Sequence, residues 1–181
     1  MLRLSEPRCP RCTFFTLVLF LLAFGTGCDT NNPSTPSEDL AGVYVFAELR
    51  FDPTALAIAD ADVLAVLDPN RNDVELFGSG RALIRIKLLD QPSDLADADF
   101  TATSSTMRIV ARTQDDEARL AQILLPGILN LNISQDNQTL SAQIAATVNL
   151  QAFDPVAYAG LTAQPGTLHI SITREVAGTG G

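Results

Sequence analysis

The sequence has 181 residues, of which 46% are hydrophobic and 18% are charged, and its formal net charge at pH 7 is −9. A chain of this length can build one domain with a core of its own. The acidic balance implies a surface that repels phosphate backbones and anionic lipid head groups, so the composition argues against nucleic-acid binding. The acids are scattered rather than gathered in a block, which is typical of a solvated surface.

The amino-terminal segment 1–27 has the organisation of an export signal. Three arginines precede an apolar run, 13–24, and small residues follow it up to Gly27. A helix that spans a bilayer needs about 20 apolar residues, so this run is too short to span and has the length of a signal-peptide core. We therefore expect segment 1–27 to be a signal helix that is removed from the mature protein.

The segment that follows the apolar run is Gly25-Thr26-Gly27-Cys28. It resembles the lipobox of bacterial lipoproteins, although that family usually has Leu or another branched aliphatic residue where this chain has Gly25. The resemblance implies cleavage between Gly27 and Cys28 and acylation of the Cys28 thiol. It also implies a membrane-anchored protein of the bacterial cell envelope, on its periplasmic or outer-membrane face. Ordinary signal-peptide cleavage after Gly25 remains the alternative.

The cysteines indicate a mature domain without disulfides. Cys9 and Cys12 form a C-x-x-C pair, a spacing that often marks redox or metal-binding chemistry. Both lie in the charged flank of the signal and are expected to leave with it. Cys28 is the only other cysteine, and acylation would consume its thiol.

The rest of the chain divides into a linker, one domain and a tail. Residues 28–39 are polar and contain two prolines, which predicts a flexible linker behind the anchor. A single β-rich domain is expected over 40–177. The glycine-rich residues 178–181 are expected to form a disordered tail.

Within the domain, apolar residues recur at every second position, the spacing of strands with one buried face. The alternation predicts strands over 43–51, 74–88, 100–112, 129–133, 140–150 and 167–176. In the first of these, the side chains expected to face inward are Val43, Val45, Ala47, Leu49 and Phe51. Gly78 and Gly80 predict a bulge or a sharp bend within the second.

Two segments are expected to be helical. Asp52-Pro53 is typical of a helix start and Asp68-Pro69 of a helix end, which predicts a helix over 52–67. Early acids and the spacing of apolar residues predict a short helix over 115–125. The acid-rich stretch 90–99 is expected to be a loop.

At least six strands with a single apolar face predict a mainly β domain with one to three short helices. Its strands are expected to form an antiparallel β-barrel or, as the alternative, a two-sheet β-sandwich. The segment Leu40-Ala41-Gly42-Val43-Tyr44 resembles the start of the first strand in bacterial lipocalin-like lipoproteins, without the tryptophan that this family often has there. That resemblance implies a lipocalin-like barrel.

Few residues are candidates for a site. Asp94, Asp97 and Asp99 are weak candidates for calcium ligands, because their spacing does not match an EF-hand loop. His169 is the only histidine, is expected on the polar side of the last strand, and cannot build a histidine-based zinc site alone. Catalytic residues, a metal site and a cofactor are therefore not predicted.

Two hypotheses about function follow. The first is a membrane-tethered binding or interaction module, which holds a small apolar ligand or docks an envelope protein and which requires a pocket of about 300 Å³ or more. The second is an envelope hydrolase that uses carboxylates, with or without calcium, and requires two acids about 5 to 10 Å apart in a cleft. The sequence favours the first and leaves the oligomeric state open.

Overall fold

The computed structural model describes residues 38–70, 72–89 and 92–175, which lie in one compact unit, Pro33–Gly181. The predicted signal, Gly27, Cys28 and the predicted tail 178–181 lie outside the described residues. Lipidation of Cys28 and cleavage before it therefore stay predictions.

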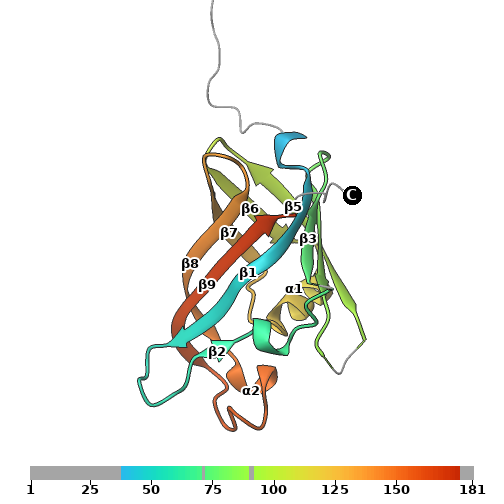
Figure 1. The fold of residues 1–181 in the computed structure, drawn as a ribbon. Helices are drawn as coiled ribbons and strands as arrows, with labels where there is room; N and C mark the ends of the chain where they lie inside the picture. Colours follow the sequence, from blue (N-terminus) through green and yellow to red (C-terminus); the bar gives the residue numbers. More distant parts are fainter. Residues whose placement is uncertain (1–37, 71, 90–91, 176–181) are drawn as a thin grey trace, which may run out of the picture. The chain divides into compact units, whose positions relative to one another are not determined.

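Eight antiparallel strands close into a barrel (Figure 1). They are β1 (Gly42–Pro53), β3 (Asp73–Leu76), β4 (Arg81–Ile86), β5 (Asp94–Ala102), β6 (Thr106–Ala111), β7 (Ile128–Ile133), β8 (Thr139–Val148) and β9 (Gln164–Arg174). Each pairs with the next, and β9 pairs back onto β1, which completes the ring. A two-residue strand, β2 (Ala61–Asp62), pairs with β1 beyond the end of β3. The predicted barrel is thus confirmed.

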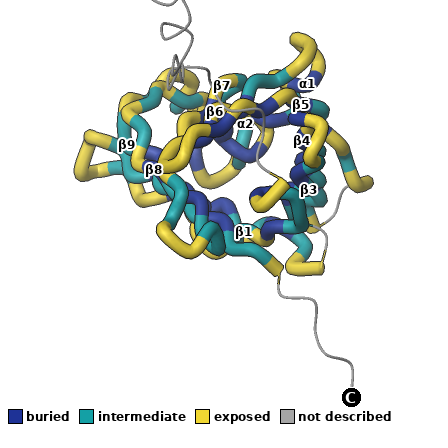
Figure 2. Tube along the Cα trace, turned by 90° about the horizontal axis from the view of Figure 1, so that it is seen from above, coloured by how far each residue is buried: buried dark blue, intermediate teal, exposed yellow. Residues whose placement is uncertain are grey.

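The barrel interior is filled from the buried face of each strand. Figure 2 shows how buried positions recur along the strands of the barrel wall. In β4 and β5 the alternation is strict, and the buried side chains are Ala82, Ile84, Ile86, Ala96, Ala98, Phe100 and Ala102. Burying apolar surface contributes about 25 cal/mol per Å², so the shared interior is what drives these strands together.

A β-bulge in β1 changes the side of the wall that its first half presents to the interior. The register with β9 shifts at Ala47, the extra residue on β1. Before the bulge Tyr44 is fully buried and Val45 is 37% exposed, whereas beyond it Leu49 and Phe51 face inward. The prediction that Val43, Val45 and Ala47 face inward is wrong, because one inserted residue exchanges the two faces of a strand.

The helix predicted over 52–67 does not form. β1 continues through Pro53, and a turn, β2 and a three-residue 3₁₀-helix, η2 (Leu64–Val66), follow it. The Thr54 amide donates to the Pro165 carbonyl at 2.9 Å, which prolongs the pairing of β1 with β9 past the proline. Tertiary pairing overrides the local start signal here, since Pro53 lies where no ladder donor is needed.

Three other predicted segments differ from the structure. The stretch 100–112 is not one strand, because β5 ends at Ala102 and β6 begins at Thr106. The stretch 74–88 is not one bent strand but a hairpin of β3 and β4, whose turn contains Gly80 with a φ of 86°. The stretch 90–99 is only partly a loop, because β5 begins at Asp94. The alternating aspartates and alanines of β5 are an amphipathic strand whose buried residues are small.

Two short α-helices follow strands of the barrel. α1 (Gln114–Ala121) confirms the helix predicted over 115–125, and α2 (Leu150–Phe153) follows β8 directly at one end of the barrel (Figure 1). Thr113 and Asn149 cap their first turns by accepting backbone N–H groups. A 3₁₀-helix, η1 (Glu38–Leu40), precedes β1. Among the described residues, no helix has the length and apolar character needed to cross a membrane.

Candidate binding pocket at the β7–β8 seam

Strands β7 and β8 pair over only two positions. Asn132 lies opposite Ser141 and Ile133 opposite Leu140, next to the hairpin that joins the strands. Beyond Ser141, β8 runs on to Val148 and pairs with β9 along its whole length, but β7 does not accompany it. We call the space between residues 128–131 of β7 and 142–148 of β8 the seam.

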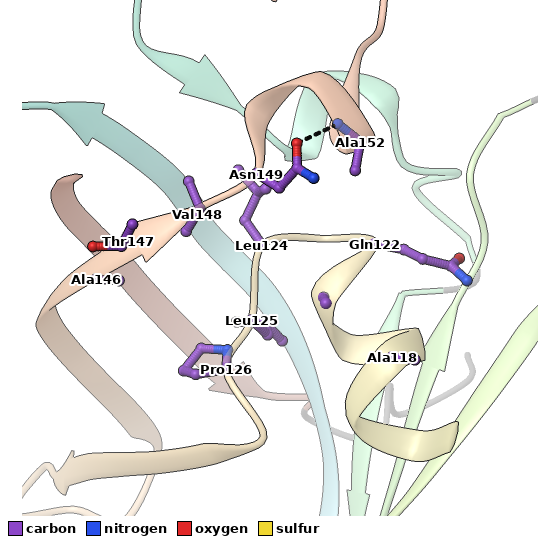
Figure 3. Close-up of a pocket in the computed structure, with 11 residues that line it drawn as sticks. Ala118, Gln122, Leu124, Leu125, Pro126, Ala146, Thr147, Val148, Asn149 and Ala152 are labelled. Atoms are coloured by element: carbon purple, nitrogen blue, oxygen red, sulfur yellow. Dashed lines mark hydrogen bonds between the residues drawn. The ribbon is translucent and has the colours of Figure 1, made fainter. Parts of the chain in front are cut away.

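A pocket of about 350 Å³ lies at the end of the seam that is farther from the β7–β8 hairpin (Figure 3). Its wall is formed by α1, the connection from α1 to β7, the end of β8 and the start of α2. The lining residues are Ala118, Ala121, Gln122, Leu124, Leu125, Pro126, Ala146, Thr147, Val148, Asn149 and Ala152. None of them is charged, and most are aliphatic.

The end of α1 shapes one side of the pocket. Leu124 adopts a left-handed conformation with φ 61°, and the Leu125 amide donates to the Leu120 carbonyl at 3.0 Å. This is a Schellman-type helix end, in which glycine is usual at the left-handed position. A leucine there costs roughly 1–2 kcal/mol of backbone strain. Its side chain is 3% exposed, so packing against the core offsets that strain.

The alanines of the lining leave the space open. Ala118, Ala121 and Ala152 line the pocket and are exposed, because no larger side chain covers them. On β8, Ala146 and Val148 face inward but are only partly buried. The pocket therefore exposes apolar surface that the barrel does not itself bury.

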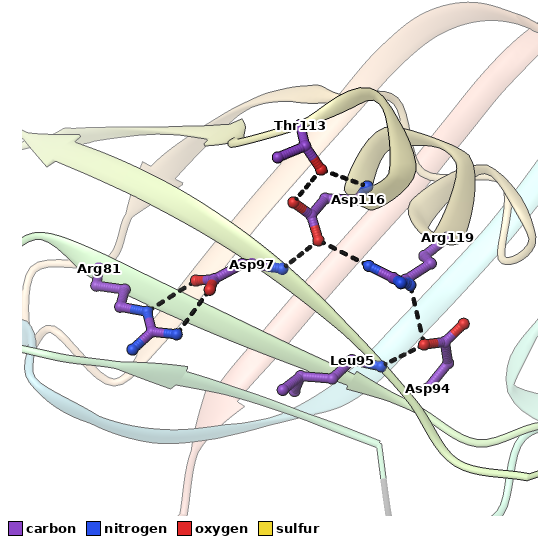
Figure 4. Close-up of polar contacts among 7 residues, drawn as sticks. All are labelled: Arg81, Asp94, Leu95, Asp97, Thr113, Asp116 and Arg119. Atoms are coloured by element: carbon purple, nitrogen blue, oxygen red, sulfur yellow. Dashed lines mark hydrogen bonds and ion pairs between the residues drawn. The ribbon is translucent and has the colours of Figure 1, made fainter.

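A buried carboxylate holds α1 against the barrel (Figure 4). Asp116 is 5% exposed and accepts hydrogen bonds from the Asp97 backbone amide at 3.0 Å, the Thr113 hydroxyl at 2.6 Å and Arg119 at 3.1 Å. The Asp97 amide comes first among the interactions that hold the pKa of Asp116 below its ordinary value, followed by the Thr113 hydroxyl. Beyond the Ala98–Ala111 pair the Arg112 amide still donates to the Asp97 carbonyl at 3.1 Å, and the Asp116 carboxylate accepts the Asp97 N–H group in place of a β6 carbonyl.

The three aspartates that were weak calcium candidates do not converge. Each forms an ion pair with a different arginine. The pairs are Asp94–Arg119 at 3.0 Å, Asp97–Arg81 at 2.6 Å and Asp99–Arg112 at 3.5 Å. The hydrogen bond from Arg81 also holds the pKa of Asp97 below its ordinary value. Across the described part of the chain, no group of three or more His, Cys, Asp or Glu residues is placed to hold a metal ion.

His169 lies on the outer wall of β9, in a polar hollow beside Glu48 and Ser171. Its Nε2 atom is 3.1 Å from the Asp52 carboxylate, and its side chain is 16% exposed. The ring is thus bound to a carboxylate, and the structure gives it no hydrogen bond to a serine among the described residues. This arrangement does not assemble a nucleophile and base.

The sequence did not single out the residues of the pocket. The alternation places Ala146 and Val148 on the inner face, but it cannot show that β7 stops short of them. One signal was present: the apolar alternation continues through 140–150 on β8, whereas on β7 it covers only 129–133. Strands of unequal length leave part of the longer one without a partner on that side.

Comparison with known proteins gives no relative from which to transfer a function. No family model matches the chain, and neither the curated proteins nor the solved structures yielded a significant match.

The role of Asp116 can be tested by Asp116→Asn. We expect this substitution to lower the free energy of unfolding by about 1–3 kcal/mol at neutral pH, because a charged acceptor of several buried hydrogen bonds is lost. Asp115→Asn, at an exposed position in the same helix turn, should change it by less than about 0.5 kcal/mol. Urea unfolding curves measure both values, and equal losses in the two variants would contradict the assigned role.

The stability difference between the wild type and Asp116→Asn should depend on pH. The pKa of Asp116 is lowered by folding, so its stabilisation is present above the unfolded pKa of about 3.9 and is lost as the pH falls through the folded pKa. The difference in unfolding free energy between the wild type and Asp116→Asn should therefore narrow below about pH 4. A difference that stays constant or widens there would show that ionised Asp116 is not the stabilising group.

Proposed function

We propose that this protein is a bacterial envelope lipoprotein whose barrel domain binds a small apolar ligand, or the apolar group of a larger one, in the pocket at the seam. The acylated Cys28 is the proposed anchor, which places the domain at the periplasmic or outer-membrane face of the envelope. The tether rests on the lipobox-like Gly25-Thr26-Gly27-Cys28. The binding function rests on one observation, the uncharged aliphatic pocket of about 350 Å³.

The pocket has the properties that apolar ligands require. Its volume falls within the range of about 300–1,000 Å³ found for small-molecule sites. A ligand that covers the exposed alanines gains about 25 cal/mol for each Å² of apolar surface removed from water. Gln122 lies in the lining with an exposed side chain, where it can hydrogen-bond to a polar end of the ligand. The side-chain oxygen of Asn149 is already bonded to the Ala152 amide at 2.9 Å.

The pocket does not support the hydrolase hypothesis. None of its 11 lining residues is an aspartate, glutamate or histidine. Asp94, Asp97 and Asp99 are bound to separate arginines outside this pocket. A carboxylate pair that could act on a ligand bound in the pocket is therefore lacking among the described residues.

Filling the pocket tests the binding function. With the full-length chain in lipid nanodiscs and its alanine methyl groups ¹³C-labelled, 1-hexanol should shift the methyl signals of Ala118, Ala121 and Ala152. In Ala146→Phe the apparent affinity for 1-hexanol, measured from these shifts, should be at least tenfold lower, because an inward phenyl ring occupies the pocket. The methyl readout separates binding in the pocket from partitioning of hexanol into the bilayer.

The matched control is Ala145→Phe, since Ala145 is the neighbouring residue on the opposite, exposed face of β8. It should bind 1-hexanol with the affinity of the wild type. If Ala146→Phe binds as well as Ala145→Phe, or if the wild type gives no shifts at these methyl groups, the proposed apolar site is wrong.

The anchor is tested by mass spectrometry of the protein extracted from membranes of an expressing bacterium. We expect an amino terminus at Cys28 that carries a diacylglycerol group, and we expect Cys28→Ser to abolish both the modification and cleavage at that position. A mature protein that begins at Thr26 with a free Cys28 thiol would refute the lipoprotein assignment. The pocket would then belong to a secreted domain.

A further inference from the structure

We propose that the ligand group in the pocket is carried by an extended peptide segment, which pairs as an additional strand with the free edge of β8. This inference rests on the proposed function, since the apolar group in the pocket becomes a side chain of that segment. Four features of the seam carry it: the direction of the β8 backbone, the absence of charge, the position of the pocket and an unpaired arginine.

The backbone of β8 offers a row of unpaired groups. The Ser134 amide donates to the Thr139 carbonyl at 2.9 Å, which marks Thr139 as a position that bonds towards β7. In an antiparallel ladder such positions recur at every second residue. Gln143, Ala145 and Thr147 therefore direct their N–H and C=O groups into the seam, where no described strand pairs with them. An added strand would pair its own N–H and C=O groups with each of these unpaired backbone groups.

The edges of the seam carry no charge. β7 reads Ile-Leu-Asn-Leu-Asn-Ile and β8 reads Thr-Leu-Ser-Ala-Gln-Ile-Ala-Ala-Thr-Val, without one acidic or basic residue. Natural proteins protect free strand edges with charged residues, lysine above all. In a chain with a net charge of −9, an uncharged edge of this length is unusual and is compatible with pairing to another strand.

The pocket adjoins this free edge. Ala146 and Val148 line the pocket from the inner face of β8, and Thr147 between them directs its backbone into the seam. A segment paired with β8 alternates its side chains in the same way, so one of its inward side chains is placed against the pocket. Strand addition of this kind takes affinity from main-chain hydrogen bonds and specificity from side-chain pockets.

An arginine on the outer wall, one strand away from the seam, indicates the charge of the segment. Arg108 on β6 lies opposite Asn130 of β7, and its side chain is exposed on the outer wall. Among the described basic side chains, it alone forms neither an ion pair nor a hydrogen bond, whereas the others bind carboxylates or carbonyls. An acidic side chain on the outward face of the segment complements it. The occupant is thus an uncharged-to-acidic extended peptide with an inward apolar residue.

The test is selection of random octapeptides on the full-length chain in nanodiscs, followed by affinity measurements with the selected peptides in capped synthetic form. The discriminating variant is Ala145→Pro, which removes one N–H from the free edge and none from the ladder with β9. We expect it to bind the peptides about five- to tenfold more weakly than the wild type, the effect of one lost hydrogen bond. Ala145→Val keeps the N–H group and should bind them as the wild type does.

Two further measurements keep the result independent of folding, and a third tests the charge of the segment. Ala145→Pro should still bind 1-hexanol in the pocket, which shows that the barrel is intact. N-methylation of alternate peptide amides should abolish binding to the wild type, because those amides are the ones that pair with β8. Arg108→Gln should weaken binding only of peptides that carry an acidic residue.

Several outcomes would overturn the proposal. Selection that yields no binding peptide, or peptides that bind Ala145→Pro as tightly as the wild type, would exclude strand addition. A wild-type dimer that is lost in Ala145→Pro would show instead that the β8 edge of a second copy fills the seam. If 1-hexanol binding persists in each case, the apolar pocket stands and only the peptide assignment falls. If hexanol binding is also absent, the proposed function fails as well.

Discussion

An antiparallel barrel depends on one constraint, that every strand must find a partner on both of its edges. Here the ring is completed firmly between β1 and β9, which stay paired from Tyr44–Arg174 to Pro53–Gly166 despite the bulge at Ala47. Gly166 permits this approach, since a Cβ atom there would lie 2.3 Å from the Asp52 carbonyl oxygen. The ring is weakest between β7 and β8, which share two paired positions. The architecture therefore concentrates its unsatisfied backbone at one place.

The candidate site follows from that imbalance. Because β8 is held along its length by β9, it keeps its extended form even where β7 has departed. The chain that precedes β7 does not extend this strand but forms α1 and the buried turn at Leu124. Asp116 of α1 accepts hydrogen bonds from the Asp97 amide of β5 and from the Thr113 hydroxyl, which holds α1 against β5. The unfilled space between these two parts of the chain is the pocket. Small residues line it, so the space is not occupied by the protein's own side chains.

Much of the fold could be predicted from the alternation of apolar residues. The strands over 129–133, 140–150 and 167–176 and the barrel itself were expected for that reason, since period-two burial needs a shared interior. The errors arose where a single residue or a distant contact decides the structure. Nothing in the sequence around Ala47 marks a bulge, and Asp52-Pro53 resembles a helix start until its pairing with β9 is known. The alanines of β5 give only a weak strand signal, because their apolar surface is small.

The pocket was beyond sequence analysis for a related reason. Most of its residues are alanines, leucines and a valine, and they form a pocket only because no larger side chain covers them. The length of a strand's partner is a long-range property, and no local pattern around Ala146 reports it. Cys28, by contrast, is indicated by sequence alone. The two halves of the proposal therefore rest on different kinds of observation and can fail separately.

The central claim is that β8 has one paired edge and one free edge. Backbone hydrogen exchange of the ligand-free, full-length chain tests it directly, because adjacent residues of β8 send their amides to opposite sides. The account predicts rapid exchange at Gln143, Ala145 and Thr147 and strong protection at Ala142, Ile144 and Ala146. Uniform protection along β8 would mean that the seam is closed in solution, and both the open pocket and the free edge would then be contradicted.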